Sequence, residues 1–310
     1  MRLGLWGAPR AGKTTYLSAL RIAAQKPVGG YNWSISGCDP ASVKFLKESV
    51  QRFVRDKDFP PATIGYRPLS WRFQGARHHE VESLFGRLRK KLSAGTSHEV
   101  TREFIVEMQD AAGESFGEDE AARQNTGVLD HLLNANGIVY VFDPIGNKEK
   151  GAGSFDFYYD TVDRLKEKMR ELDMLAGSSL PHFVSVCVTK FDHPDIFDAA
   201  MKAGIIYQEH EGAMPVVPSS IAPEFLRSLC QDEGSRWVCD TLQSDFLPER
   251  VKYFATSSVG FHLNNGKFNL RDYSNVAEDG RHFLSAAAPI NVLEPIISLA
   301  DRVRDQEGMA

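Results

Sequence analysis

The sequence has few cysteines, and their spacing suggests neither a metal site nor a disulfide framework. The 310-residue chain contains four of them, Cys38, Cys187, Cys230 and Cys239. None forms a Cys-x-x-Cys pair. Cys230 and Cys239 are separated by eight residues within a predicted helical region, which is a poor spacing for metal ligands. The pattern favours free thiols in a reducing cytosol over disulfides or zinc.

The chain also lacks the features that accompany membrane insertion, lipid attachment and general nucleic-acid binding. No apolar run reaches the length of a membrane span, and neither end carries a prenylation or myristoylation motif. A strand predicted from residue 2 leaves no room for a signal peptide. The formal charge is −5, from 36 basic and 41 acidic residues, whereas nucleic-acid-binding domains carry a basic surface. We therefore expect a cytoplasmic protein with no transmembrane segment and no nucleic-acid partner.

What the chain does contain is a globular composition and, at its start, a phosphate-binding motif. Hydrophobic residues make up 42% and charged residues 25%, which is enough for a sizeable core. Residues 7–14 read Gly-Ala-Pro-Arg-Ala-Gly-Lys-Thr and match the pattern G-x-x-x-x-G-K-[ST] at each fixed position. The residues before the motif are typical of a short strand, and those from Thr15 onward are typical of an amphipathic helix.

This arrangement predicts a loop that surrounds the phosphates of a nucleotide. The glycines let backbone N–H groups point inward, and the start of the helix adds the positive end of its dipole. Lys13 is expected to reach the β- and γ-phosphates, and the Thr14 hydroxyl is expected to ligate magnesium. The alternative is a chance glycine-rich turn, which the strand and helix on either side disfavour.

A candidate sensor of the γ-phosphate follows a hydrophobic strand predicted at 103–109. Asp110 there is expected to hold magnesium through water, and the N–H of Gly113 to bond the γ-phosphate. The D-x-x-G pattern is a weak signal alone, and its position after a hydrophobic strand and downstream of a phosphate loop makes the assignment more specific. Thr63, just before a strand predicted at 67–74, is a candidate switch residue that senses magnesium. The alternative for Thr63 is an ordinary threonine in a turn.

The stretch that selects the base follows a buried strand predicted at 183–188. Asp192 can accept hydrogen bonds from N1–H and the N2 amine of guanine, whereas adenine has an acceptor at N1 and lacks the amine. The stem of Lys190 can lie along the face of the base. The alternative is a polar loop at the end of a strand. After the last predicted strand, at 251–255, the backbone of Ser257 and Ser258 is placed to contact the guanine O6.

These ordered motifs resemble the Ras-like GTPase domain of the translation-factor-related P-loop class. The resemblance covers residues 1–260 and the closing helix. It implies an α/β fold with a mostly parallel six-stranded sheet, helices on both faces and helical insertions. The parallel strands are expected at 2–7, 103–109, 138–142, 183–188 and 251–255, with 67–74 as an antiparallel edge strand.

The resemblance also implies GTP or GDP with Mg²⁺ as ligands, and it assigns a role to each matching residue. The implied nucleotide contacts are Gly7, Arg10, Ala11, Gly12, Lys13, Thr14, Thr15, Asp110, Gly113, Thr189, Lys190, Asp192, Ser257 and Ser258. The implied metal set is Thr14, Thr63 and Asp110. The implied catalytic residues are Lys13, Glu114 and Arg10.

The sequence departs from the family pattern at three positions. Thr189 replaces the usual Asn, so a hydrogen bond between the base loop and the phosphate loop is expected to be lost or changed. Glu114 stands where Ras and Gα proteins have the glutamine that orients the attacking water. Arg10 lies in the phosphate loop, as in guanylate-binding proteins, which use such an arginine as a finger. The alternative is an arginine that points to solvent or pairs with an acidic switch residue.

Residues 1–310 are expected to form one GTPase domain, with insertions at about 26–60, 75–100 and 193–250. Long chains of this kind resemble the bacterial double-GTPase type of regulatory GTPase. Effector or regulatory proteins that bind through the insertions are the expected partners, with a homodimer as an alternative. A helix predicted at 79–92 has a basic outer face that is either solvated or a docking patch for an acidic partner.

Two functions fit these features. The first is a GTP-hydrolysing molecular switch whose intrinsic turnover is slow, because the usual glutamine is absent. The second is an interaction scaffold that GTP or GDP stabilises and that hydrolyses little, which Glu114 and the large insertions favour. An ATPase or kinase with the same loop is disfavoured by Asp192 and by residues 256–258.

Overall fold

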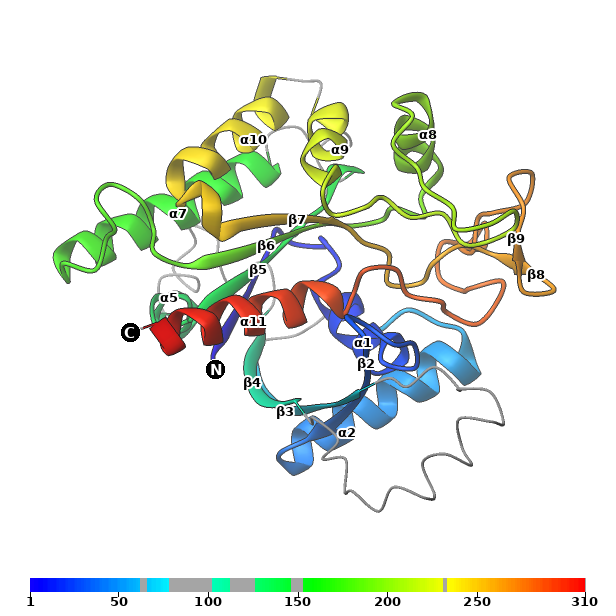
Figure 1. Cartoon of the computed structure of the whole chain (residues 1–310), viewed down its shortest axis with the longest axis horizontal. Helices are drawn as coiled ribbons and strands as arrows, with labels where there is room; N and C mark the ends of the chain where they lie inside the picture. Colours follow the sequence, from blue (N-terminus) through cyan, green and yellow to red (C-terminus); the bar gives the residue numbers. More distant parts are fainter. Residues whose placement is uncertain (62–65, 78–101, 112–125, 146–152, 231–232, 310) are drawn as a thin grey trace, which may run out of the picture.

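A sheet of four parallel strands in the order β1-β5-β6-β7 forms the centre of the molecule (Figure 1). The computed structural model describes residues 1–61, 66–77, 102–111, 126–145, 153–230 and 233–309. The four strands are β1 (Leu3–Trp6), β5 (Gly137–Phe142), β6 (Phe183–Val188) and β7 (Val251–Ala255). β1 and β5 are buried along their whole length, as expected of apolar runs in a parallel sheet with both faces covered.

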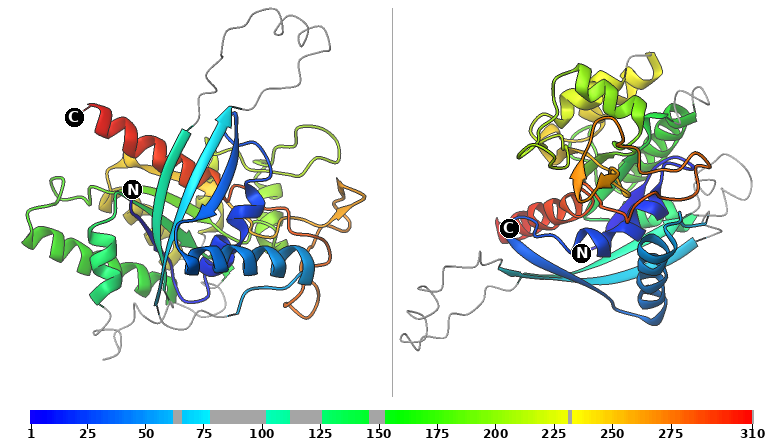
Figure 2. Two further views of the ribbon diagram at one scale, coloured as in Figure 1. Left: turned by 90° about the horizontal axis from the view of Figure 1, so that it is seen from below. Right: turned by 90° about the vertical axis from the view of Figure 1, so that its right-hand side faces the viewer.

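An antiparallel sheet in the order β2-β3-β4 continues the arrangement beyond β1. Its long strands are β2 (Tyr31–Gly37), β3 (Tyr66–Arg77) and β4 (Arg102–Ala111). β4 meets β1 through one parallel bridge, between Arg2 and Glu107. Figure 2 shows the three long strands lying next to one another. The second sheet thus runs on from the first with a narrow seam between them.

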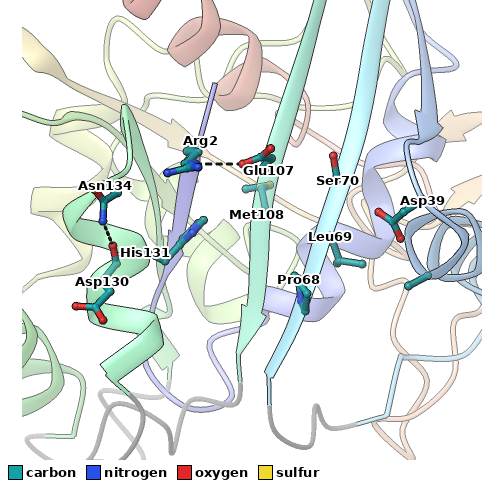
Figure 3. A pocket seen from close by; sticks show the side chains of 11 residues that line it. Arg2, Asp39, Pro68, Leu69, Ser70, Glu107, Met108, Asp130, His131 and Asn134 are labelled. Atoms are coloured by element: carbon teal, nitrogen blue, oxygen red, sulfur yellow. Dashed lines mark hydrogen bonds and ion pairs between the residues drawn. The ribbon is translucent and has the colours of Figure 1, made fainter.

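A cavity of ≈ 530 Å³ lies along this seam (Figure 3). Helix α5 (Thr126–Leu133) contributes one wall, and β3 and the start of helix α2 (Pro40–Val50) contribute the other. Arg2 spans the gap between β1 and β4, with its Nε 3.2 Å from the Oε2 of Glu107. His131 of α5 lies on the β1 side, where its Nε2 is 2.9 Å from the carbonyl oxygen of Leu3. The start of β1 and β4 are thus joined by the Arg2–Glu107 ion pair and by one backbone hydrogen bond, from the Glu107 N–H to the carbonyl oxygen of Met1 at 3.2 Å.

The α/β class with helices on both faces is confirmed, but three details of the predicted six-stranded sheet were wrong. The strand predicted at 103–109 runs parallel to β1 as predicted, but it meets β1 through one bridge and belongs to a separate three-stranded antiparallel sheet. The strand predicted at 67–74 lies between β2 and β4 rather than at an edge. The edge strand is β2, which the sequence analysis did not predict. Its signal was the alternation of buried Trp33 and Ile35 with exposed polar neighbours.

Two helices cover one face of the parallel sheet, and one of them is the helix predicted to follow the phosphate loop. α11 (Glu294–Met309) packs on β5 and β6, and α1 (Lys13–Ala23) lies beside its start. The Tyr16 hydroxyl of α1 donates to the carbonyl oxygen of Val292 at 2.7 Å. Burial raises the pKa of Tyr16 well above its ordinary value, so the hydroxyl stays a donor.

The remaining helices of the parallel half cover the opposite face (Figure 1). They are α5, α7 (Gly153–Glu171), α8 (Pro194–Lys202), α9 (Ala222–Leu229) and α10 (Glu233–Asp245). Asp245 joins α10 to α7, because it accepts from the Tyr158 hydroxyl at 3.0 Å and from Lys166 at 2.5 Å. The short helix η3 (Pro248–Arg250) then leads into β7, and a small hairpin of β8 (Leu263–Asn264) and β9 (Lys267–Phe268) precedes α11. The predicted helices near 197–202, 223–230 and 235–242 correspond to α8, α9 and α10.

Helix α2 begins at a capping aspartate and buries one stripe of its surface. The Asp39 side chain caps its first turn, accepting from the Ser42 N–H at 2.9 Å. Val43 is 50% exposed. Phe45 is buried instead and packs against Trp71 of β3, with ring centroids 5.8 Å apart. The chain then continues into the π-helical segment η1 (Gln51–Asp56), where Phe53 is buried.

Several predictions lie outside the described residues. These are the basic helix predicted at 79–92 and the site residues Thr63, Gly113 and Glu114. Within the described residues, no helix combines the length and the apolar character needed to cross a bilayer.

The buried His182 beside β6 makes the stability of this fold sensitive to acid. The side chain is 3% exposed, and its Nε2 lies 3.0 Å from the carbonyl oxygen of Leu132. Burial lowers its pKa from 6.5 to about 4, because the interior disfavours the charged imidazolium. Between those values the unfolded chain binds a proton that the folded chain does not. The free energy of unfolding therefore falls as the pH drops through that window.

We predict that His182→Gln removes part of this acid sensitivity. Wild type should lose roughly 2 kcal/mol from this group between about pH 7 and about pH 5, and the variant should not. Urea denaturation at both pH values measures the difference. His210→Gln, at an exposed position, is the matched control and should behave as wild type. An unchanged pH dependence in His182→Gln would contradict the assignment.

Candidate functional site

Most of the predicted site residues that the structure describes lie in loops at the carboxyl ends of the central strands or in the first turn of α1, and Asp110 lies near the carboxyl end of β4. The loop after β1 leads into α1, and the loops after β5, β6 and β7 begin at neighbouring positions. Phe142 at the end of β5 pairs with Val188 at the end of β6, and Val188 pairs with Ala255 at the end of β7. In open α/β sheets, this edge is where ligands bind.

The phosphate loop contains a tight turn, and two residues of the loop have left-handed backbone conformations. Ala11 N–H donates to the carbonyl oxygen of Ala8 at 3.1 Å, which closes a β-turn over Pro9 and Arg10. Arg10 has φ 64°, and Gly12 has φ 92°. Proline at the second turn position and positive φ at the third are the marks of a type II turn. A left-handed glycine immediately before α1 is what the motif predicted.

Gly7 is required for a different reason, namely the close approach of the neighbouring strand. A Cβ atom at this position would lie 2.5 Å from the carbonyl oxygen of Val141 in β5. Any larger residue would therefore push the loop away from the sheet. The glycine therefore allows the loop to pass close to β5 as it leaves β1.

Lys13 folds back over the loop that precedes it. Its side chain is buried, and its Nζ donates to the carbonyl oxygens of Gly7 at 2.8 Å and Ala8 at 3.0 Å. The ammonium group therefore lies inside the curve of the loop rather than in solvent. Thr14 and Thr15, both partly exposed, follow in the first turn of α1. This turn contains no acidic residue, so no carboxylate of its own offsets the positive end of the helix dipole there.

The other predicted phosphate-side residues are placed in part. Asp110 lies next to the last residue of β4, opposite Arg67 of β3. β4 runs parallel to β1 where they meet, so its carboxyl end points toward the same edge as the phosphate loop. Arg10 is exposed and forms no ion pair with any residue that the structure describes. Thr63, Gly113 and Glu114 lie outside the described residues.

Thr189 connects the base loop to both the neighbouring strand and the phosphate loop. Its N–H donates to the carbonyl oxygen of Phe142 at 2.9 Å. Its Oγ1 lies 3.0 Å from that same oxygen and 3.3 Å from the carbonyl oxygen of Ala11. The hydroxyl has one hydrogen, which these two acceptors share. The connection between the two loops is thus changed from the usual asparagine but is not lost.

Lys190 forms an ion pair with a buried aspartate that was not among the predicted site residues. Its Nζ donates to the Oδ2 of Asp143 at 2.7 Å. Asp143 is 5% exposed, and its Oδ1 accepts from the N–H of Ile145 at 3.0 Å. Lys190 itself has φ 59°, a left-handed conformation that is unusual for lysine. The pair fixes the ammonium at the end of β5 and leaves the stem half-exposed.

Asp192 is held by the loop that follows β7. The Ser257 hydroxyl donates to its Oδ1 at 2.5 Å and accepts from the N–H of Gly260 at 2.7 Å. Ser257 is fully buried, whereas Ser258 is partly exposed. Burial raises the pKa of Asp192, and the Ser257 hydrogen bond opposes that rise. The two predicted base-side elements, 189–192 and 256–258, are therefore in direct contact.

An aromatic cluster supports the base loop from below. Phe191 is fully buried and meets the rings of Phe197, Phe225 and Phe261 edge-on, with centroids 5.5–5.8 Å apart. Edge-on aromatic pairs at this separation are favourable beyond their burial. Phe191 thus fixes the loop to the core, and with it the positions of its two neighbours, Lys190 and the buried Asp192.

Comparison with known proteins adds little to this description. No protein-family model matches the chain, and no curated protein matches it. Among solved structures, it is similar to the signal recognition particle receptor SRb-GTP/SRX complex from Chaetomium thermophilum. That match has 14% sequence identity and a TM-score of 0.35, and it covers 84% of this chain and 94% of that one. The functional assignment therefore depends on the residues of the site.

We predict that the Lys190–Asp143 pair contributes measurably to stability, unlike an exposed pair. Asp143→Asn leaves the ammonium facing an amide and should lower the free energy of unfolding by about 1–3 kcal/mol. Glu103→Gln in the exposed Arg72–Glu103 pair is the matched control and should cost no more than about 1 kcal/mol. Urea denaturation at neutral pH compares the two. Equal effects would show that burial of Asp143 adds nothing to its pairing.

Proposed function

We propose that the chain is a Ras-like P-loop GTPase that binds GTP with Mg²⁺ and hydrolyses it to GDP. The observation that carries the proposal is the adjacency of two loops of different chemistry. The loop that carries Lys13 and the loop that carries Asp192 are joined through the Thr189 hydroxyl, which lies 3.3 Å from the carbonyl oxygen of Ala11. A phosphate-binding loop and a base-selecting loop side by side fit a single nucleotide.

The phosphate end of the site fits a triphosphate with magnesium. Lys13 holds a positive charge inside the loop, and the first turn of α1 presents backbone N–H groups that no acidic side chain of that turn neutralises. Thr14 is proposed to ligate the metal directly, with Asp110 holding it through water and Thr63 completing the set. When bound, the metal would neutralise charge that develops on the phosphates during transfer. Gly113 is proposed to sense the γ-phosphate through its N–H.

The base end fits guanine better than adenine. An ionised Asp192 offers acceptors to both N1–H and the N2 amine of guanine, and the Ser257 hydroxyl fixes one of its oxygens in place. Lys190, tethered at its tip by Asp143, presents its stem as a surface on which the base can lie. The partly exposed Ser258 is proposed to contact the guanine O6 through its N–H.

Hydrolysis and switching are the finer part of the proposal. Arg10 and Glu114 are the proposed catalytic residues besides Lys13. Arg10 has the exposure that a finger residue needs. The γ-phosphate would order Thr63 and the segment after Asp110, and effector or regulatory proteins would read that difference. We assign residues 1–310 to one domain, with 26–60, 75–100 and 193–250 as insertions that offer partner surfaces.

We predict that Lys13→Met weakens binding of GTP and GDP by at least about 100-fold, since charge-assisted contacts of this kind are strong. Fluorescence titration measures binding, and phosphate release at several protein concentrations measures turnover. Lys44→Met on the exposed face of α2 is the matched control and should bind as wild type. Melting of each variant without nucleotide separates loss of the site from loss of the fold.

Four outcomes of these measurements bear on the proposal. Wild-type affinity in Lys13→Met would overturn the site assignment. Slow, concentration-independent phosphate release from wild type supports the switch, whereas a steep rise with concentration indicates self-association and an Arg10 finger. Tight binding with no release at any concentration would replace hydrolysis by the scaffold role.

We predict that Asp192→Asn changes base preference from guanine to xanthine. The asparagine amide can accept from N1–H of xanthine and donate to its C2 oxygen, whereas it meets the N2 amine of guanine with a donor. GDP affinity should fall on the order of 10²-fold or more, while affinity for the xanthine analogue rises. Titrations with GDP, xanthosine diphosphate and ADP measure this, with ADP as the reference that neither protein binds well. ADP binding as tight as GDP binding in wild type would contradict the base assignment.

A further inference from the structure

Cys230 and Cys239 are separated in sequence but meet in the fold. Cys230 caps the carboxyl end of α9, and Cys239 lies within α10, nine positions further on. Their Sγ atoms are 2.6 Å apart. The structure holds all four cysteines as thiols, and in the part of the chain that it describes no other pair of sulfurs is placed in contact.

The separation of the two sulfurs is closer to a covalent bond than to an ordinary contact. Unbonded carbon atoms, which are smaller than sulfur, are most stable at about 3.5–4.0 Å. A disulfide bond is about 2.05 Å long. The backbones of α9 and α10 therefore already bring the two side chains together, and forming the bond requires a movement of well under 1 Å between the sulfurs.

The surroundings of the pair limit which reagents can reach it. Cys230 is 2% exposed and Cys239 is 6% exposed. Tyr140 of β5 and Tyr253 of β7 lie near the pair on the sheet side. Such low exposure favours a small oxidant such as hydrogen peroxide over a bulky disulfide reagent. The other two thiols have no partner of this kind, since Cys38 is exposed and Cys187 lies under α1 beside Tyr16.

We propose that Cys230 and Cys239 are an oxidation site at which hydrogen peroxide forms an intramolecular disulfide. The thiolate of one cysteine attacks the peroxide, so that the O–O bond breaks, a sulfenic acid forms and one water leaves. The neighbouring thiol then attacks the sulfenic sulfur, and its proton leaves with the hydroxyl as a second water. In total, two thiols and one peroxide give one disulfide and two waters. Excess dithiol reverses the reaction by exchange.

The bond would connect two helices that pack on different neighbours. α9 contributes Phe225 to the aromatic cluster below the base loop, and α10 is joined to α7 through Asp245. Closing the ten-residue segment 230–239 removes freedom from the unfolded chain. The oxidised protein should therefore melt at a higher temperature, by on the order of 5 °C.

The test treats the full-length chain in a Cys38→Ser background with increasing hydrogen peroxide under native conditions. Remaining thiols are alkylated after denaturation, and peptides are mapped by mass spectrometry. We expect a linked peptide containing Cys230 and Cys239, a mass lower by two hydrogen atoms, and a Cys187 that is still alkylated. Dithiothreitol should restore both alkylation sites and the lower melting temperature. None of these measurements depends on nucleotide binding.

Three cysteine-to-serine variants and the wild-type protein distinguish an intramolecular disulfide from other oxidation products. Cys230→Ser and Cys239→Ser should each abolish the linked peptide, and Cys187→Ser should keep it. If a serine variant does not fold, the mapping on the Cys38→Ser protein decides alone. The proposal is overturned if both thiols remain alkylated at a peroxide dose that oxidises Cys38 completely in wild type. Separate sulfinic or sulfonic acids without a link would overturn it too, and an unchanged melting temperature would refute the stabilising effect.

Discussion

The contact that the candidate site depends on is the shared hydrogen bond of the Thr189 hydroxyl. It joins three chain segments: the phosphate loop at Ala11, the end of β5 at Phe142, and the base loop itself. Without it, the base loop would still be attached to β5 and to the loop after β7, but it would lose this link to the phosphate loop. Because Thr189 is buried, this hydroxyl cannot exchange its partners for water at low cost. This buried hydrogen bond therefore helps to fix the position of the two loops relative to each other.

The two lysines of the site are held in different ways, and the difference fits their proposed tasks. Lys13 is held by carbonyl groups of its own loop, inside a curve of backbone where phosphate oxygens are expected. Lys190 is held by the carboxylate of Asp143, so the pair adds little net charge at the base end. A nucleotide has its charge on the phosphates and a neutral base. The arrangement places a neutralised lysine stem where the base is proposed to lie.

The local motifs were predictable from the sequence, because each is read from neighbouring residues. The loop at 7–14, the strand ends before Asp110 and Thr189, and the Asp39 cap need no knowledge of distant contacts. Asp143 was not recognised as part of the site, because its partner Lys190 is 47 positions away and the pairing depends on β5 and β6 being adjacent. The contact between Cys230 and Cys239 depends in the same way on how α9 and α10 are placed.

Other errors arose where packing selected among faces or edges that the pattern left open. β2 has a clear alternation in its sequence, but residues 26–60 were assigned to an insertion and no strand was predicted there. In α2, Phe45 rather than Val43 is buried, because Trp71 of β3 offers an aromatic surface on that side. The choice of buried face in α2 is not encoded in a short window, since it depends on β3 lying in the middle of its sheet.

Two residues of the candidate site have a backbone conformation that is strained for a residue with a side chain. Arg10 and Lys190 both have positive φ, a conformation that costs a residue with a side chain roughly 1–2 kcal/mol. Glycine would remove that cost at either position. For Lys190, the ion pair with Asp143 and the hydrogen bonds of Thr189 fix the conformation. The contacts that build the base end of the site are therefore the same ones that hold this residue in its strained conformation. For Arg10, the turn closed by Ala8 and Ala11 imposes the conformation, while the side chain itself is exposed. Stability alone would favour glycine in this turn, and the exposed guanidinium is consistent with the finger role proposed for Arg10.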